Sequence, residues 1–166
     1  MNIIKKIFIA LSLLTSSFLL TQDVEAKDLT GRLGLGFINE FSNSTSLRSI
    51  PAVSAKYSIT RDIAVLGCFG LNSLDPAGYT VCAKVFKNIF FETNMNFYVS
   101  GGFGLIKLDR TAVEILGVFG TEVFIPGIES LGLSFEAGVA ATNLSGSFIL
   151  KTIGYTFLHA GVHFYF

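Results

Sequence analysis

The sequence has no tryptophan and only three prolines, and charged residues make up 14% of its 166 residues. Acidic and basic side chains balance, so the formal net charge is zero. Nucleic-acid-binding proteins normally carry a basic excess, which disfavours that class here. The chain is instead 51% hydrophobic, with 17 glycines and 17 phenylalanines. These proportions suit a sheet with one apolar face and one face of small residues better than the core of a soluble enzyme.

The N-terminus predicts an export signal. Lys5 and Lys6 form a positive segment, Ile7–Leu20 is apolar, and Val24-Glu25-Ala26 offers a small-x-small cleavage site. The apolar stretch is shorter than the roughly 20 residues that a membrane-spanning helix needs. We therefore expect a cleavable signal peptide over 1–26 and one exported domain over 27–166, in line with a prior of about one domain for this length.

Beyond that segment, the sequence lacks long apolar runs, because glycines and polar residues interrupt each candidate. A helical membrane bundle is thereby excluded. Closed β-barrels are the other structures that can span lipid, since every backbone polar group must find a partner there.

Eight segments of alternating polarity can be placed along the exported part, which predicts an all-β chain. The connections include a polar loop Ile38–Ser49, a turn Thr60-Arg61-Asp62, a segment Lys87–Thr93 and a final loop Thr142–Gly154. Lys87–Thr93 is long for the side of a barrel that should carry short turns. The predicted strands are Thr30–Phe37, Ile50–Ile59, Ile63–Leu71, Tyr79–Phe86, Asn94–Ile106, Ala112–Phe124, Ser130–Ala141 and Tyr155–Phe166.

The last of these strands alternates strictly and ends in Phe164-Tyr165-Phe166. An alternating strand that ends in phenylalanine resembles the closing strand of bacterial outer-membrane β-barrel proteins. The strand–turn–strand unit Val123–Ala141, with Pro126-Gly127 at its turn, is also similar to small members of that group. The resemblance implies an eight-stranded antiparallel up-and-down transmembrane barrel of the OmpA/OmpX type. It also implies that Phe164 and Phe166 form the signal read by the barrel assembly machinery.

One face of the predicted sheet carries no charge. The alternate positions that continue the Phe166 face through the other strands are apolar, as in Leu33, Leu35 and Phe37. The opposite face carries six charges, three of each sign, at Arg32, Lys56, Lys84, Glu114, Glu122 and Glu136. A Lys or Arg at the bilayer midplane costs roughly 2–4 kcal/mol, so this segregation favours lipid outside and charge inside. Near the expected periplasmic ends, an aromatic girdle is predicted from Tyr57, Phe86, Phe90, Phe91 and Phe124.

The same alternation would also fit a soluble exported barrel of the lipocalin type, with the apolar face turned inward. Within the membrane hypothesis, the inner charges are expected to pair, because an unpaired buried charge is costly. A narrow ion or solute path along these charges is the alternative.

Cys68 and Cys82 are equally distant from Asp75, the centre of the intervening loop. In a symmetric hairpin they face each other, and an exported protein meets oxidising conditions. We predict a disulfide, the alternative being two small buried side chains. No histidine or third thiol is expected beside them, so no metal site is predicted.

His159 and His163 fall on the inner face of the last strand, with Ser134 and Glu136 on the inner face of the strand before it. The expected fold brings Glu136 opposite His159 and Ser134 near His163. Serine, histidine and glutamate are the components of a hydrolytic site, and some barrels of this size modify lipid A. No nucleophile motif surrounds Ser134, however, and His163 lies near the periplasmic end.

These inferences predict an outer-membrane barrel with both termini in the periplasm and a lumen filled by side chains. We expect a structural or surface-interaction role rather than catalysis, with no cofactor. The expected partners are outer-membrane lipids, the barrel assembly machinery and an unidentified surface partner reached through the loops, with no role for nucleic acid.

Overall fold

The computed structural model describes residues 27–39, 52–73, 77–107, 111–143, 147–153 and 159–166. The predicted signal peptide, most of the loop Ile38–Ser49, and residues 155–158 of the predicted last strand lie outside these ranges. Within the described ranges, the structure contains no helix that is long and apolar enough to cross a membrane.

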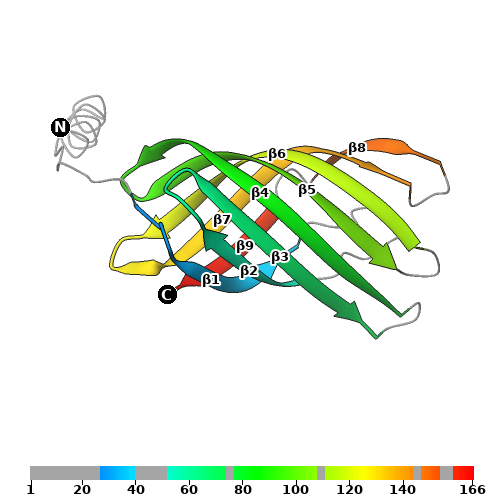
Figure 1. Cartoon of the computed structure of the whole chain (residues 1–166), viewed down its shortest axis with the longest axis horizontal. Helices are drawn as coiled ribbons and strands as arrows, with labels where there is room; N and C mark the ends of the chain where they lie inside the picture. The colour runs from blue at the N-terminus through cyan, green and yellow to red at the C-terminus, as the bar shows by residue number, and fades with distance from the viewer. Residues whose placement is uncertain (1–26, 40–51, 74–76, 108–110, 144–146, 154–158) are drawn as a thin grey trace, which may run out of the picture.

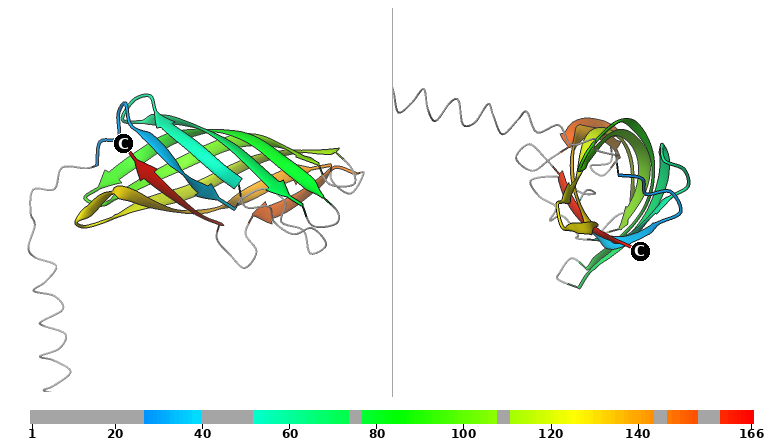
Figure 2. Two further views of the ribbon diagram at one scale, coloured as in Figure 1. Left: turned by 90° about the horizontal axis from the view of Figure 1, so that it is seen from below. Right: turned by 90° about the vertical axis from the view of Figure 1, so that its left-hand side faces the viewer.

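The described residues form a closed antiparallel barrel whose strands are strongly tilted (Figure 1). Each strand from β1 to β7 pairs with the next one along the chain, and β9 pairs with both β7 and β1. Viewed from one end, the strands enclose a lumen (Figure 2). The predicted all-β, eight-stranded, up-and-down barrel is thereby confirmed. The strands are β1 Leu33–Ile38, β2 Ala52–Ser58, β3 Ile63–Asn72, β4 Gly78–Glu92, β5 Met95–Lys107, β6 Thr111–Ile125, β7 Ile128–Thr142, β8 Ile149–Ile153 and β9 His159–Tyr165.

β8 and β9 together occupy the eighth strand position. β8 pairs with the last residues of β7 and β9 with its first half, so β8 lies at one end of the barrel and β9 at the other (Figure 1). The predicted loop Thr142–Gly154 is therefore wrong, because β7 continues to Thr142 and Ile149–Ile153 returns as a strand. Gly138 pairs with Ile153, whereas Glu136 pairs with His159, so the register shifts by four residues between the two pieces.

Short turns gather at one end of the barrel, together with the C-terminus (Figure 2). The predicted turn after β2 is present, and the Thr60 hydroxyl accepts hydrogen bonds from the backbone N–H groups of Asp62 and Ile63. Between β6 and β7, Pro126 and Gly127 form a two-residue turn in which Gly127 has φ +86°. Proline followed by a glycine at positive φ is the signature of a type II turn. We call this end the turn end and the opposite one the loop end.

The connection predicted over Lys87–Thr93 is also wrong. β4 continues to Glu92 and meets β5 through the short turn Thr93-Asn94, as the turn end of such a barrel requires. A register shift between Asn88 and Phe90 inserts one residue into β4 and inverts its alternation. The sequence pattern stops at that bulge, although the strand does not.

The first strand begins later than predicted. Gly31 has φ +76° and lies in a turn in which Arg32 N–H donates to the carbonyl of Leu29. Just before this turn, the Thr30 hydroxyl and backbone N–H both donate to the Asp28 carboxylate, which lowers the pKa of Asp28. The strand therefore starts only at Leu33, and Arg32 stands at the rim.

The two faces of the barrel differ as the alternation predicts. Apolar side chains point outward along every strand, with Phe37, Phe103 and Ile115 more than half exposed. Five charged side chains of β2, β4, β6 and β7 point into the lumen and are 1–6% exposed: Lys56, Lys84, Glu114, Glu122 and Glu136. Two residues of the predicted girdle, Phe86 and Phe124, are instead buried inside.

Candidate functional site in the barrel interior

The interior carries a cluster of three residues near the turn end. The Lys56 ammonium lies 2.8 Å from Glu122 Oε2, and the Tyr165 hydroxyl donates to Glu122 Oε1 at 2.6 Å. Each carboxylate oxygen therefore has its own donor. A buried ion pair is tolerated when further hydrogen bonds satisfy its remaining atoms, and this pair meets that condition.

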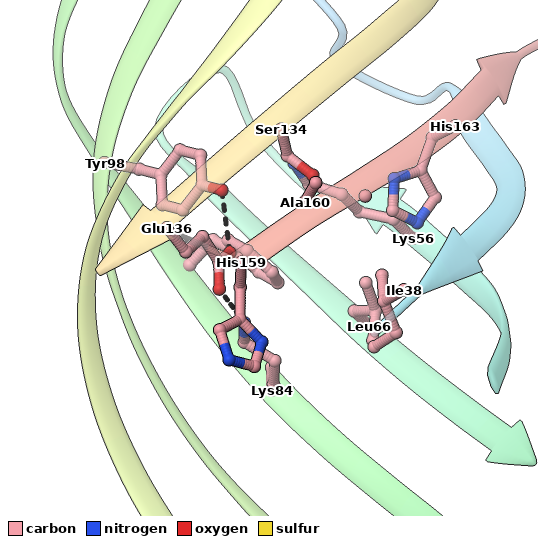
Figure 3. Close-up of a pocket in the computed structure, with 12 residues that line it drawn as sticks. Ile38, Lys56, Leu66, Lys84, Tyr98, Ser134, Glu136, His159, Ala160 and His163 are labelled. Carbon is pink, nitrogen blue, oxygen red and sulfur yellow. Dashed lines mark hydrogen bonds and ion pairs between the residues drawn. The ribbon is translucent and has the colours of Figure 1, made fainter. Parts of the chain in front are cut away.

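A second cluster of the same composition lies further along the lumen. The Lys84 ammonium is 2.6 Å from Glu136 Oε2, and the Tyr98 hydroxyl donates to Glu136 Oε1 at 2.7 Å. Glu136 stands between the two donors, with His159 close by (Figure 3). The Phe86 ring connects this cluster to the first, because the Lys84 and Lys56 ammonium groups lie 5.0 and 4.5 Å from its centroid.

Both tyrosine rings lie over glycines of neighbouring strands. A Cβ at Gly120 would approach the Tyr98 ring to 2.7 Å, and one at Gly34 would approach the Tyr165 ring to the same distance. These glycines are the direct cross-strand partners of the two tyrosines. The absent side chains leave room for each ring to lie along the wall and carry its hydroxyl to a glutamate.

A third ion pair lies toward the loop end. The Lys151 ammonium is 2.7 Å from Glu114 Oε2, but the two groups are not aligned as a hydrogen bond. Lys151 belongs to β8, the strand that the sequence pattern missed. The prediction that Arg32 supplies the third inner cation is wrong, since Arg32 stands half-buried at the rim before β1.

Ser134, Glu136, His159 and His163 line one small cavity. Glu136 pairs with His159 across the strands as expected, whereas Ser134 pairs with Gly161. His163 Nε2 lies 2.9 Å from the hydroxyl of Ser54 on β2. Glu136 accepts from Lys84 and Tyr98.

Cys68 and Cys82 are direct cross-strand partners on β3 and β4, and the structure joins them in a disulfide. Both side chains point inward. Among the described residues, no group of three or more potential His, Cys, Asp or Glu ligands lies close enough to hold a metal ion.

The lumen between these clusters is nearly filled. The cavity bounded by Lys56, Lys84, Tyr98, Glu136 and His163 has a volume of only about 10 Å³, roughly the space of one water molecule. At the turn end, Leu29 packs with Phe124 and Tyr165 as a buried apolar plug. Around these two clusters, the described interior therefore contains closely packed side chains.

Sequence reasoning missed the two tyrosines, the Phe86 ring and Lys151. Tyr98 and Tyr165 lie at inward positions of their strands, so alternation alone contains the signal for them. Only the strand pairing of the closed barrel shows that each tyrosine hydroxyl reaches a glutamate two strands away. Lys151 required recognition of β8, for which the short alternation Ile149–Ile153 gives weak support.

Comparison with solved structures supports the architecture. The chain is similar to the N-terminal β-barrel domain of Pseudomonas aeruginosa OprF, with a TM-score of 0.56 and 14% identity over 82% of this chain and 98% of that domain. No protein-family model matches the chain, and no curated protein sequence does. At this level of identity the likeness shows the fold, an eight-stranded antiparallel barrel.

Proposed function

We propose that this chain is an outer-membrane β-barrel protein with a structural or surface-interaction role and a lumen filled by side chains. The proposal rests mainly on one observation. The described outer face of the barrel is apolar over its middle, while the lysines and glutamates at mid-strand are buried in the lumen. A soluble barrel of the lipocalin type has the opposite arrangement.

The position of the outward charges supports a membrane location. In the described strands these charges lie near strand ends, at Lys87, Glu92, Lys107 and Glu129. Lys87 pairs with Asp62 at 2.7 Å beside the short turn after β2. The band between the two rims carries only uncharged side chains, which are mostly apolar, as a surface in contact with acyl chains requires. In water, an apolar surface of this extent would cause association.

The difference between the two ends of the barrel indicates its orientation in the membrane. In barrels of this class, short turns face the periplasm and longer loops face outward. The turn end carries the two-residue turns and the C-terminus, so we place both termini in the periplasm. The connections after β1, β3, β5 and β7 would then face the exterior and offer the surface for an unidentified partner.

The C-terminal rings support a route into the membrane. Phe164 and Phe166 both point outward and contact each other, with ring centroids 5.2 Å apart. Such a pair would be accessible to the assembly machinery before the barrel closes and to lipid afterwards. The signal peptide over 1–26 belongs to the same hypothesis.

Membrane fractionation combined with a heat-modifiability gel tests the proposal. The protein should sediment with outer membranes and migrate as a compact species that shifts when boiled. Recovery as a soluble periplasmic protein, with unchanged mobility on heating, would overturn it. Cysteines introduced singly at the loop end should react with a membrane-impermeant maleimide on intact cells, whereas cysteines at the turn end should not.

The filled lumen favours a non-conducting barrel over a narrow pore. The apolar plug of Leu29, Phe124 and Tyr165 closes the turn end, and the two Lys–Glu–Tyr clusters fill the region above it. Purified protein in planar bilayers should give no reproducible conductance steps. Steps of constant size in the unaltered protein would instead support the pore.

A further inference from the structure

The outer face of the barrel has one concave region, which the proposed role leaves unexplained. A groove of about 300 Å³ crosses β1, β9 and β7. Its outward apolar side chains are Phe37 on β1, Ala160 and Val162 on β9, and Leu133 and Phe135 on β7. Ile38, Gly161 and the exposed Asn39, which follows β1, complete the lining. Phe37 and Leu133 flank Val162 in register, and Phe135 is the cross-strand partner of Ala160.

The groove arises from the small residues of β9. Ala160 is the cross-strand partner of Phe135 on β7, and Val162 is the partner of Phe37 on β1, so the short outward side chains of β9 lie lower than the phenylalanine on each side. The interior cannot fill this depression. A Cβ at Gly161 would lie 2.6 Å from Ser134 Oγ and 3.1 Å from Ile38 Cγ2, which shows that the inner side of the wall is already closely packed.

We propose that this groove binds one acyl chain of a membrane phospholipid. The inference rests on the proposed membrane location. Phe135 is the middle residue of β7, so the groove lies near the mid-height of the barrel, at a depth occupied by lipid tails. The five outward side chains that line it are apolar. If no acyl chain entered the groove, the side chains that line it would lose their dispersion contacts with lipid.

The chemistry of the lining limits the occupant. A headgroup would need several polar or charged partners, and the lining offers one polar side chain, that of Asn39. The volume matches the lower end of small-ligand pockets, as a single flexible chain requires. A second copy of this barrel is the other occupant that the test below distinguishes.

Native mass spectrometry of the exported chain tests the assignment. The protein is folded into dioleoyl phosphatidylcholine vesicles, extracted in a mild detergent and analysed with increasing activation. The unaltered protein should retain one phospholipid after the other adducts are lost. In Ala160→Phe, whose ring fills the groove, that adduct should disappear. Ala137→Phe adds the same ring to the outer face of β7 beyond the groove, and it should retain the lipid.

A second variant covers the case in which Ala160→Phe does not fold. Phe135→Ala removes one wall of the groove without adding volume, so it should fold and lose the adduct at lower activation than the unaltered protein. Unchanged retention in both groove variants, an adduct of detergent mass only, or a dimer in place of the lipid would overturn the groove assignment. Each variant is first checked for membrane recovery and heat-dependent mobility. Failure of the unaltered protein at that step would count against the membrane location itself, independently of the groove.

Discussion

The two halves of the lumen differ in how completely their charges are satisfied. In the half near the turn end, Glu122 and Glu136 each accept from one lysine and one tyrosine, so all four carboxylate oxygens have donors. Near the loop end, among the residues that the structure describes, Glu114 is paired with the Lys151 ammonium but accepts no hydrogen bond. Within the same part of the chain, the buried hydroxyls of Thr142, its cross-strand partner, and of Thr80 find no partner either.

Local geometry explains this difference. Near the turn end, the tyrosines that complete each cluster lie over glycines and are fixed by the barrel register. Near the loop end, the cation comes from β8, a five-residue strand that pairs only with β7 among the described strands. Buried polar atoms that lack protein partners are normally satisfied by water. We therefore expect the surroundings of Glu122 and Glu136 to be dry and those of Glu114 to be hydrated. The turn-side half also holds two buried atoms without a partner among the described residues, Asn96 Oδ1 and His163 Nδ1, so the contrast concerns the carboxylates.

Breaking a turn-side pair should have the largest effect. Lys84→Met keeps the length of the side chain but leaves Glu136 charged and buried, which should lower the free energy of unfolding by about 3–5 kcal/mol. The measurement is urea-induced unfolding in vesicles, followed by circular dichroism and by gel mobility. The double variant Lys84→Met with Glu136→Leu should recover most of the loss. A double variant as unstable as the single one would show that the charge is not the cause.

Removing one hydroxyl group from each half of the lumen should change the free energy of unfolding by different amounts. Tyr98→Phe deletes a hydrogen bond to a buried carboxylate, so we expect a loss of roughly 1.5–3 kcal/mol. Thr142→Val deletes a buried hydroxyl that has no partner among the described residues, so the change should be neutral or slightly stabilising. Parallel unfolding curves of the two variants check this contrast. Equal losses would mean that the loop-side hydroxyl is as well satisfied as the turn-side one.

Two glycines of β6 offer a matched pair, because one lies beneath the Tyr98 ring and the other faces outward. A Cβ at Gly120 would press on the Tyr98 ring, whereas nothing lies within 4 Å of a Cβ at Gly117. Gly120→Ala should therefore cost about 1–3 kcal/mol through overpacking. Gly117→Ala points outward and should be neutral or stabilising, since alanine restricts the unfolded chain. The same unfolding assay compares them, and similar behaviour would remove the ring–glycine contact from the explanation.

The sequence predicts the barrel well because its alternation is nearly unbroken from β2 through β7. That pattern places Lys56, Lys84, Glu122 and Glu136 inside before any register is known. The spacing of Cys68 and Cys82 about Asp75 likewise anticipates their cross-strand position.

The sequence fails where alternation is interrupted or where partners are distant. The bulge beside Asn88 inverts the pattern of β4, and the four-residue register shift separates β8 from β9. Lys151 is consequently mistaken for a loop residue and Arg32 for an inner one. The pairing of Ser54 with His163 joins residues from β2 and β9, on opposite sides of β1, and only the closed barrel reveals it.

Removing the loop-side cation should have a much smaller effect than removing the turn-side one. Lys151→Met is chemically the same change as Lys84→Met, and it too removes the cation from a buried glutamate. If water reaches Glu114, the lost partner is replaced by solvent, and the cost should stay within about 1 kcal/mol, as for ion pairs in contact with water. The Lys151 side chain is 15% exposed, compared with 1% for Lys84, which is consistent with such access. A loss as large as that of Lys84→Met in the same vesicle assay would mean that the loop-side half is as dry as the turn-side half. The contrast between the halves would then reflect hydrogen-bond geometry alone, because exclusion of water would be common to both.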